Sequence, residues 1–182
     1  AAQVALHGLP IWDDPPVRGQ GSIVASRLSL DLGSPLRTLA GEVQVRFDAL
    51  EVAERRLNDV RVGVRMVAGE VLIDRATFEL AGGGAVEASG SLLPARETFS
   101  ARAIGSSLSL AALAGTEADG VLQGLLDLEA TASGRLDDPE LTATVVTDGL
   151  RYGQVQGGRI VLEARRGPGQ DLAIEAPEFL PA

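Results

Sequence analysis

The chain has 182 residues, of which 45% are hydrophobic but only 3% are aromatic, so any core must consist mainly of Val, Leu, Ile and Ala. The formal net charge of −9 argues against nucleic-acid binding and against direct adhesion to an anionic membrane, because both need a basic face. The absence of Cys excludes disulfides and thiolate metal sites, and no apolar run reaches the roughly 18 residues needed to span a bilayer.

Residues 1–20 are rich in chain breakers and are expected to include irregular structure. They contain the only histidine, His7, so a catalytic triad would have a single candidate base, and an edge or surface position is favoured for it. Trp12 lies among Pro residues, where local packing is favoured over contact with a partner. The chain starts with Ala and shows no signal peptide, so we interpret it as an internal fragment of a longer protein.

From residue 41 onward, apolar and polar residues alternate, which is typical of strands with one apolar face. The segments with this pattern are 43–49, 60–66, 86–92, 126–131, 141–145, 160–165 and 172–176. Short links containing Gly, Asp and Gly, or Pro join them, which favours antiparallel neighbours because parallel strands need long crossovers. The spacing predicts an all-β chain of about ten to twelve strands.

One segment departs from this alternation. Ser107–Gly115 (SLSLAALAG) predicts a short helical turn near 107–115, with Ser109 as its N-cap.

Gly82–Gly84 is predicted to be a bulge or tight turn, since no Lys-Ser/Thr pair follows it as in a phosphate-binding loop.

The chain is expected to be a single β-rich segment over 1–182, with a weak internal repeat at about 41–92 and 120–176. Asp48–Val52 (DALEV) resembles Asp148–Tyr152 (DGLRY). Leu57–Gly69 resembles Val155–Gly167 in the same way. Such repetition is typical of a protein that repeats one structural unit along its length.

Asp137, Asp138 and Glu140 place three carboxylates within four residues. Catalysis would need two carboxylates at a set separation with one of them desolvated, whereas these lie in a polar connection beside Pro139. We therefore predict a solvated turn. A single His without Cys nearly excludes zinc, and no segment has the spacing of a calcium loop. No enzyme activity, cofactor or metal is expected.

The segment Gly120–Arg166 resembles the repeating unit of TamB-type proteins. That unit begins with G-x-L-x-G, continues with G-x-L-x-x-P-x-L and ends in a GL-x-Y-G corner, with alternating strands between. The matching positions are Gly120, Leu122 and Gly124; Gly134, Leu136, Pro139 and Leu141; and Gly149, Leu150, Tyr152 and Gly153. Upstream, the AsmA-like pattern is matched by Gly69, Val71, Gly82, Gly83, Gly90 and Leu92. The resemblance covers residues 41–166.

This resemblance to the TamB/AsmA-like superfamily of bridge-like lipid-transfer proteins implies a long antiparallel sheet folded into a trough, or taco, with an apolar interior. It implies a periplasmic segment of a Gram-negative envelope protein, anchored in the inner membrane by a part outside this sequence. It also implies that the parent protein conducts phospholipid between the inner and outer membranes. In the family this activity supports outer-membrane biogenesis and protein assembly or secretion, with an outer-membrane barrel as partner through other parts of the chain.

Our hypothesis is passive conduction, in which phospholipid acyl chains lie on the apolar face without any reaction. Ten Leu, Val or Ile side chains left in water would cost about 15–30 kcal/mol, so the face needs a cover from its own sheet, from acyl chains or from a partner. The predicted lining residues are Val43, Val45, Phe47, Val60, Val62, Val64, Leu126, Leu128, Leu141, Val145, Ile160 and Leu162.

Two other functions stay open. One is a structural module without a ligand, such as an adhesin-like β-solenoid or a sandwich with a closed core. The other is a carbohydrate hydrolase on a β scaffold, which would need two convergent carboxylates in a cleft.

Overall fold

The computed structural model describes residues 2–7, 17–29, 40–52, 55–114 and 122–180. These form twelve strands, one short helix and one 3-10 turn. In chain order they are β1 (Ala2–His7), β2 (Val17–Ser29), β3 (Ala40–Val52), β4 (Arg55–Val67), β5 (Glu70–Leu80), β6 (Ala85–Leu93), η1 (Pro94–Arg96), β7 (Thr98–Ser109), α2 (Leu110–Ala114), β8 (Leu122–Arg135), β9 (Pro139–Tyr152), β10 (Val155–Gln156), β11 (Arg159–Arg166) and β12 (Ala173–Leu180).

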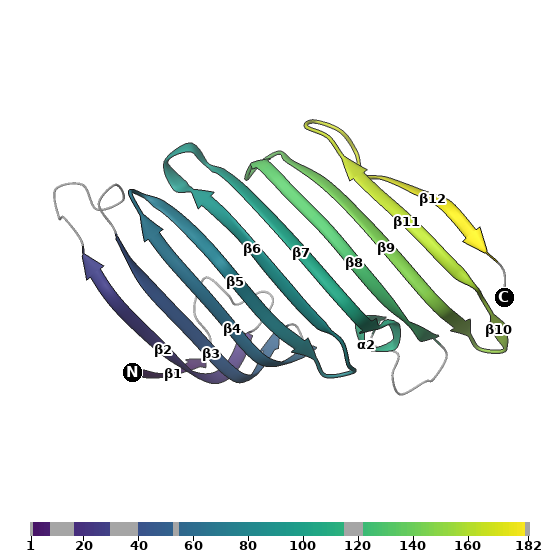
Figure 1. Ribbon diagram of the computed structural model, residues 1–182, viewed down its shortest axis with the longest axis horizontal. Helices are drawn as coiled ribbons and strands as arrows, with labels where there is room; N and C mark the ends of the chain where they lie inside the picture. Colours follow the sequence, from purple (N-terminus) through teal and green to yellow (C-terminus); the bar gives the residue numbers. More distant parts are fainter. Residues whose placement is uncertain (1, 8–16, 30–39, 53–54, 115–121, 181–182) are drawn as a thin grey trace.

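The strands form one open antiparallel sheet in which neighbours in sequence are neighbours in space (Figure 1). The order runs from β1 to β9 and then to β11 and β12, while the short β10 pairs with the end of β9. Links of two to four residues join β4 to β5, β5 to β6, β6 to β7 and β8 to β9. Links this short reverse the chain at the strand ends and can join only antiparallel strands. The predicted fold class, an all-β antiparallel trough, is confirmed.

Glycine turns set where these strands end. Gly83 and Gly84 have φ values of 97° and 93°, which other residues rarely adopt. A Cβ on Gly84 would also lie 2.5 Å from the carbonyl oxygen of Ser107, so a larger residue would push β7 away. The predicted tight turn at this GGG segment is confirmed.

The predicted helical turn is α2, and its cap is the predicted one. The Ser109 hydroxyl accepts a hydrogen bond from the Ala112 backbone N–H at 3.3 Å, the geometry of an N-cap. The predicted range was too wide at its start, because residues 107–109 belong to β7. At its end, residue 115 lies outside the described residues.

The expectation of irregular structure within residues 1–20 stays a prediction, because residues 8–16 lie outside the described residues. Residues 2–7 form β1 and residues 17–20 begin β2, because antiparallel pairing with β2 and β3 holds both segments in the sheet. Trp12 lies outside the described residues. The proposed internal repeat stays a prediction.

The sheet exposes more surface than a compact fold would. The chain has 11816 Å² of accessible surface, whereas a compact monomer of 18.8 kDa exposes about 8,300 Å². A single layer of strands leaves both faces available to solvent or to partners, which explains the difference.

Candidate functional site

Strand pairing places all twelve predicted lining residues on one face of the sheet. In the N-terminal half, Val43 is opposite Val64, Val45 opposite Val62 and Phe47 opposite Val60. In the C-terminal half, Leu128 is opposite Val145 and Val145 is opposite Leu162. Phe47, Val60 and Leu126 are buried, and the other predicted residues are half-buried.

A row of small side chains joins the two halves of this face. The pairing register aligns one apolar residue from each of ten neighbouring strands, so the row runs across the strands. In strand order the row consists of Ile23, Val45, Val62, Ala76, Ala88, Ala103, Ala130, Ala143, Ala164 and Ile174. We call the alanines from β5 to β11 the alanine row. With about 4.8 Å between strands, the whole ten-residue row is about 43 Å long.

Larger apolar side chains flank the alanine row. On one side lie Leu128, Val145 and Leu162, and on the other side, two rows away, Leu92 is opposite Phe99. The alanine row is therefore a low strip between taller side chains, because successive residues on one face of a strand stand side by side. This row could not be predicted from the sequence, because alternation shows which face of a strand a residue occupies but not which residue stands opposite it on the next strand.

Helix α2 covers one end of the apolar face. The Leu110 side chain lies 3.1 Å from the position that a Cβ on Gly124 would take, and Gly124 alternates with Leu126 and Leu128. Beside the helix, Leu108 is 2% exposed and Leu126 is 8% exposed. Within the described residues, these neighbours of α2 are among the most buried side chains. The apolar face is therefore shielded from water where α2 packs on it.

Thr147 breaks the apolar pattern next to this covered end. It is 5% exposed and stands opposite both Leu126 and Ile160. Its hydroxyl is buried without a hydrogen-bond partner in the described structure, which carries a desolvation cost.

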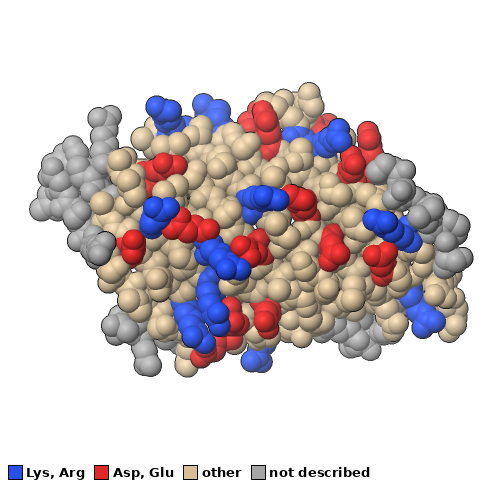
Figure 2. Space-filling view, in the orientation of Figure 1, with Lys and Arg blue, Asp and Glu red and all other residues tan. Residues whose placement is uncertain are grey.

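The opposite face is polar, and its charged side chains form ion pairs with one another. Figure 2 shows acidic and basic side chains intermingled across the sheet. Ion pairs link adjacent strands at 2.5–2.7 Å: Arg65–Asp74, Arg75–Glu87 and Arg102–Glu129. Hydroxyl pairs add to this pattern, at 3.2 Å for Ser91–Ser100 and 2.6 Å for Thr131–Thr142. Because all these groups are exposed, the face is suited to water.

The carboxylates at 137–138 lie in a turn, as predicted. Arg135 donates two hydrogen bonds to Asp137, at 2.9 and 3.1 Å, and this contact lowers the pKa of Asp137 below its ordinary value. The carboxylate of Asp138 accepts a hydrogen bond from the Gly169 backbone N–H at 2.9 Å and lies 3.5 Å from Arg166. These contacts tie the β8–β9 turn to the segment between β11 and β12, which is a structural role.

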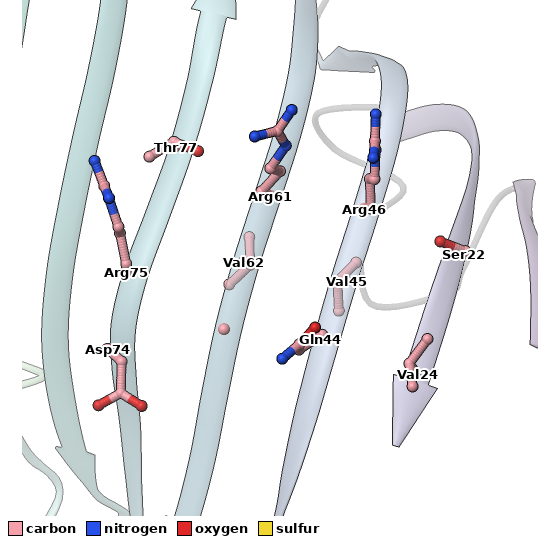
Figure 3. Close-up of a pocket in the computed structure, with 11 residues that line it drawn as sticks. Ser22, Val24, Gln44, Val45, Arg46, Arg61, Val62, Asp74, Arg75 and Thr77 are labelled. Carbon is pink, nitrogen blue, oxygen red and sulfur yellow. The ribbon is translucent and has the colours of Figure 1, made fainter. Parts of the chain in front are cut away.

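A hollow of about 840 Å³ lies on the polar face over β2–β5 (Figure 3). Side chains of Ser22, Val24, Gln44, Arg46, Arg61, Asp74, Arg75 and Thr77 line it, and the strand floor includes Val45, Val62 and Gly63. Another hollow, of about 350 Å³, lies over β4–β7.

Within the described residues, no three His, Asp or Glu side chains gather as a metal site would require. No described helix is both long and apolar enough to cross a bilayer. No family model, curated protein or solved structure was found to match this chain.

Proposed function

We propose that the apolar face of this sheet holds phospholipid acyl chains and lets them slide along the alanine row, without chemical reaction. The observation that carries the proposal is the unbroken apolar row across ten strands. An acyl chain is long, narrow and without directional bonding groups. A low strip between taller apolar side chains suits it for that reason.

The resemblance of residues 41–166 to TamB/AsmA-like proteins supports the same function. We propose on this basis that the chain is a periplasmic segment of a Gram-negative envelope protein that transfers phospholipid between inner and outer membranes. Its partners would then be phospholipid and, through other parts of the parent chain, an outer-membrane assembly barrel. In this arrangement the ion-paired face turns toward water while the apolar face turns toward the lipid.

The alternative is a structural module whose apolar face is closed by protein. That function requires other parts of the protein to bury the alanine row as fully as Leu126 is buried beside α2. The two functions therefore predict different neighbours for the same side chains.

Photo-crosslinking in cells that produce the complete parent protein distinguishes these functions. A photoreactive amino acid replaces Val62 or Leu128 on the apolar face. The matched controls are Gln44 and Thr131, which lie on the polar face of β3 and β8. We expect crosslinks to phospholipid from the two apolar positions only.

Equal capture of phospholipid from both faces would contradict the proposal. Exclusive crosslinks from Val62 and Leu128 to protein would instead favour the closed structural module.

A further inference from the structure

Two regions of the polar face differ in the regularity of their strand pairing. Between β6 and β7, the pairing runs without a register shift from Ala85 to Leu93. Over β4–β5, Gly63 is opposite Arg75 while Val64 is opposite Ile73, so Asp74 is an extra residue. Such a β-bulge bends the strand and re-aims side chains. The hollow of about 840 Å³ lies here, where both Asp74 and Arg75 are exposed.

Gly63 adds depth to the hollow. It is flanked on β3 by Gln44 and on β5 by Arg75. A Cβ at this position would meet only the Arg75 carbonyl oxygen, at 3.8 Å, so the space above Gly63 is open.

Three guanidinium groups from three adjacent strands share this hollow. Figure 3 shows Arg46, Arg61 and Arg75 extending in the same direction, with Asp74 pointing the opposite way. Asp74 is engaged by two hydrogen bonds from Arg65, so its charge is already compensated. The end of the hollow at the three arginines therefore gathers guanidinium donors, although Asp48, Asp59 and Glu87 lie beside them.

These arginines keep hydrogen-bond donors to spare. Arg61 contacts Asp59 through one terminal nitrogen at 2.7 Å, and Arg75 contacts Glu87 in the same way at 2.7 Å. Arg46 approaches Asp48 and Asp59 only at 3.7 and 3.9 Å, beyond hydrogen-bond distance. A guanidinium group carries five N–H donors, so most of them stay available for a ligand.

We propose that this hollow binds a small phosphate monoester with a polar, uncharged body, such as a sugar phosphate. The forked guanidinium groups of Arg46 and Arg61 match the oxygens of a phosphate, which a point charge such as an ammonium would match less well. Ser22, Gln44 and Thr77 present hydroxyl and amide groups to the body of the ligand. The volume of about 840 Å³ lies within the range of small-molecule sites. The site is on the opposite face from the alanine row and does not depend on the proposed lipid function.

Calorimetric titration of the intact protein with glucose 6-phosphate tests this proposal, with glucose and inorganic phosphate as comparison ligands. We expect the ester to bind more tightly than inorganic phosphate and glucose not to bind. The double substitution Arg46→Gln and Arg61→Gln should weaken binding by about tenfold, because it removes charge-assisted hydrogen bonds. Arg102→Gln is the matched control, since Arg102 is an equally exposed, ion-paired arginine on the flat part of the face.

A gain-of-function variant separates binding from folding. Asp59 competes with the ligand for Arg46 and Arg61, and its φ of 46° is one that Asn also tolerates. Asp59→Asn should therefore tighten binding of the ester, an effect that loss of structure cannot produce. No binding of the ester, equal binding of inorganic phosphate, equal weakening by Arg102→Gln, or no tightening by Asp59→Asn would each overturn the proposal.

Discussion

The two faces of this sheet are built from alternate residues of the same strands, yet they differ in what they require. On the polar face, charges pair across strands and stay hydrated, as in Arg102–Glu129 at 2.7 Å. On the apolar face, a row of side chains crosses ten strands, and α2 packs on the same face beside Leu126 of β8. The polar face is stable in contact with water, whereas the apolar face is stable only where another apolar surface packs against it.

The covered end of the apolar face shows how large this difference is. Leu126 is 8% exposed, while its neighbour Leu125 on the other face is 53% exposed. One residue of offset thus separates a core position from a solvated one, because the side chains of a strand alternate between faces.

The largest effect is expected from truncating these two leucines. Leu126→Ala should lower the free energy of unfolding by about 2–4 kcal/mol, because it leaves a cavity beside Leu108. Leu125→Ala should change it by less than about 0.5 kcal/mol. Urea denaturation of both variants measures the difference, and equal losses would show that the two faces are not distinct here.

The next largest effect is expected on the amount of phospholipid that, in the proposed function, binds along the alanine row. Ala130→Phe places a large side chain in the low strip, and overpacking of this kind costs about 1–3 kcal/mol. Phospholipid that copurifies with the protein should then fall by about tenfold, as measured by mass spectrometry of extracted lipid. Thr131→Phe, one residue away on the polar face, is the control and should leave the lipid unchanged.

A gain of stability is expected at Thr147. Thr147→Val removes the buried hydroxyl that lacks a partner while keeping the shape, and should raise the free energy of unfolding by about 1 kcal/mol. Thr144→Val is made in the same strand on the exposed face and should have a smaller effect. If Thr147→Val is destabilising in urea denaturation, its hydroxyl has a partner in solution.

A smaller effect is expected from the ion pairs of the polar face. Arg102→Ala should lower the free energy of unfolding by no more than about 0.5 kcal/mol, because both side chains are exposed and screened. A loss comparable with that of Leu126→Ala would mean that the polar face is also covered.

The smallest effect is a local change in titration. Hydrogen bonds from Arg65 lower the pKa of Asp74. A lowered folded-state pKa means that any stabilisation is present above the unfolded-state pKa of about 3.9 and is lost as the pH falls through the folded value. NMR titration of the carboxyl group should show the pKa of Asp74 rising in Arg65→Gln and unchanged in Arg102→Gln.

Much of the fold follows from the sequence alone. The alternation of Val43, Val45 and Phe47 with charged residues identified both the strand and its apolar face, because the side-chain period of a strand is two. Short breaker-containing links identified antiparallel neighbours, and Ser109 identified the start of α2. The same reasoning placed Asp137 and Asp138 in a turn.

Only the tertiary structure decided which residues stand opposite one another. Alternation is a property within one strand, whereas register depends on turn geometry and on bulges such as that at Asp74. For this reason the sequence predicted that the twelve larger residues share one face, but it predicted neither the alanine row that joins them nor the hollow above Gly63. Both features arise where several strands meet, and no single strand encodes them.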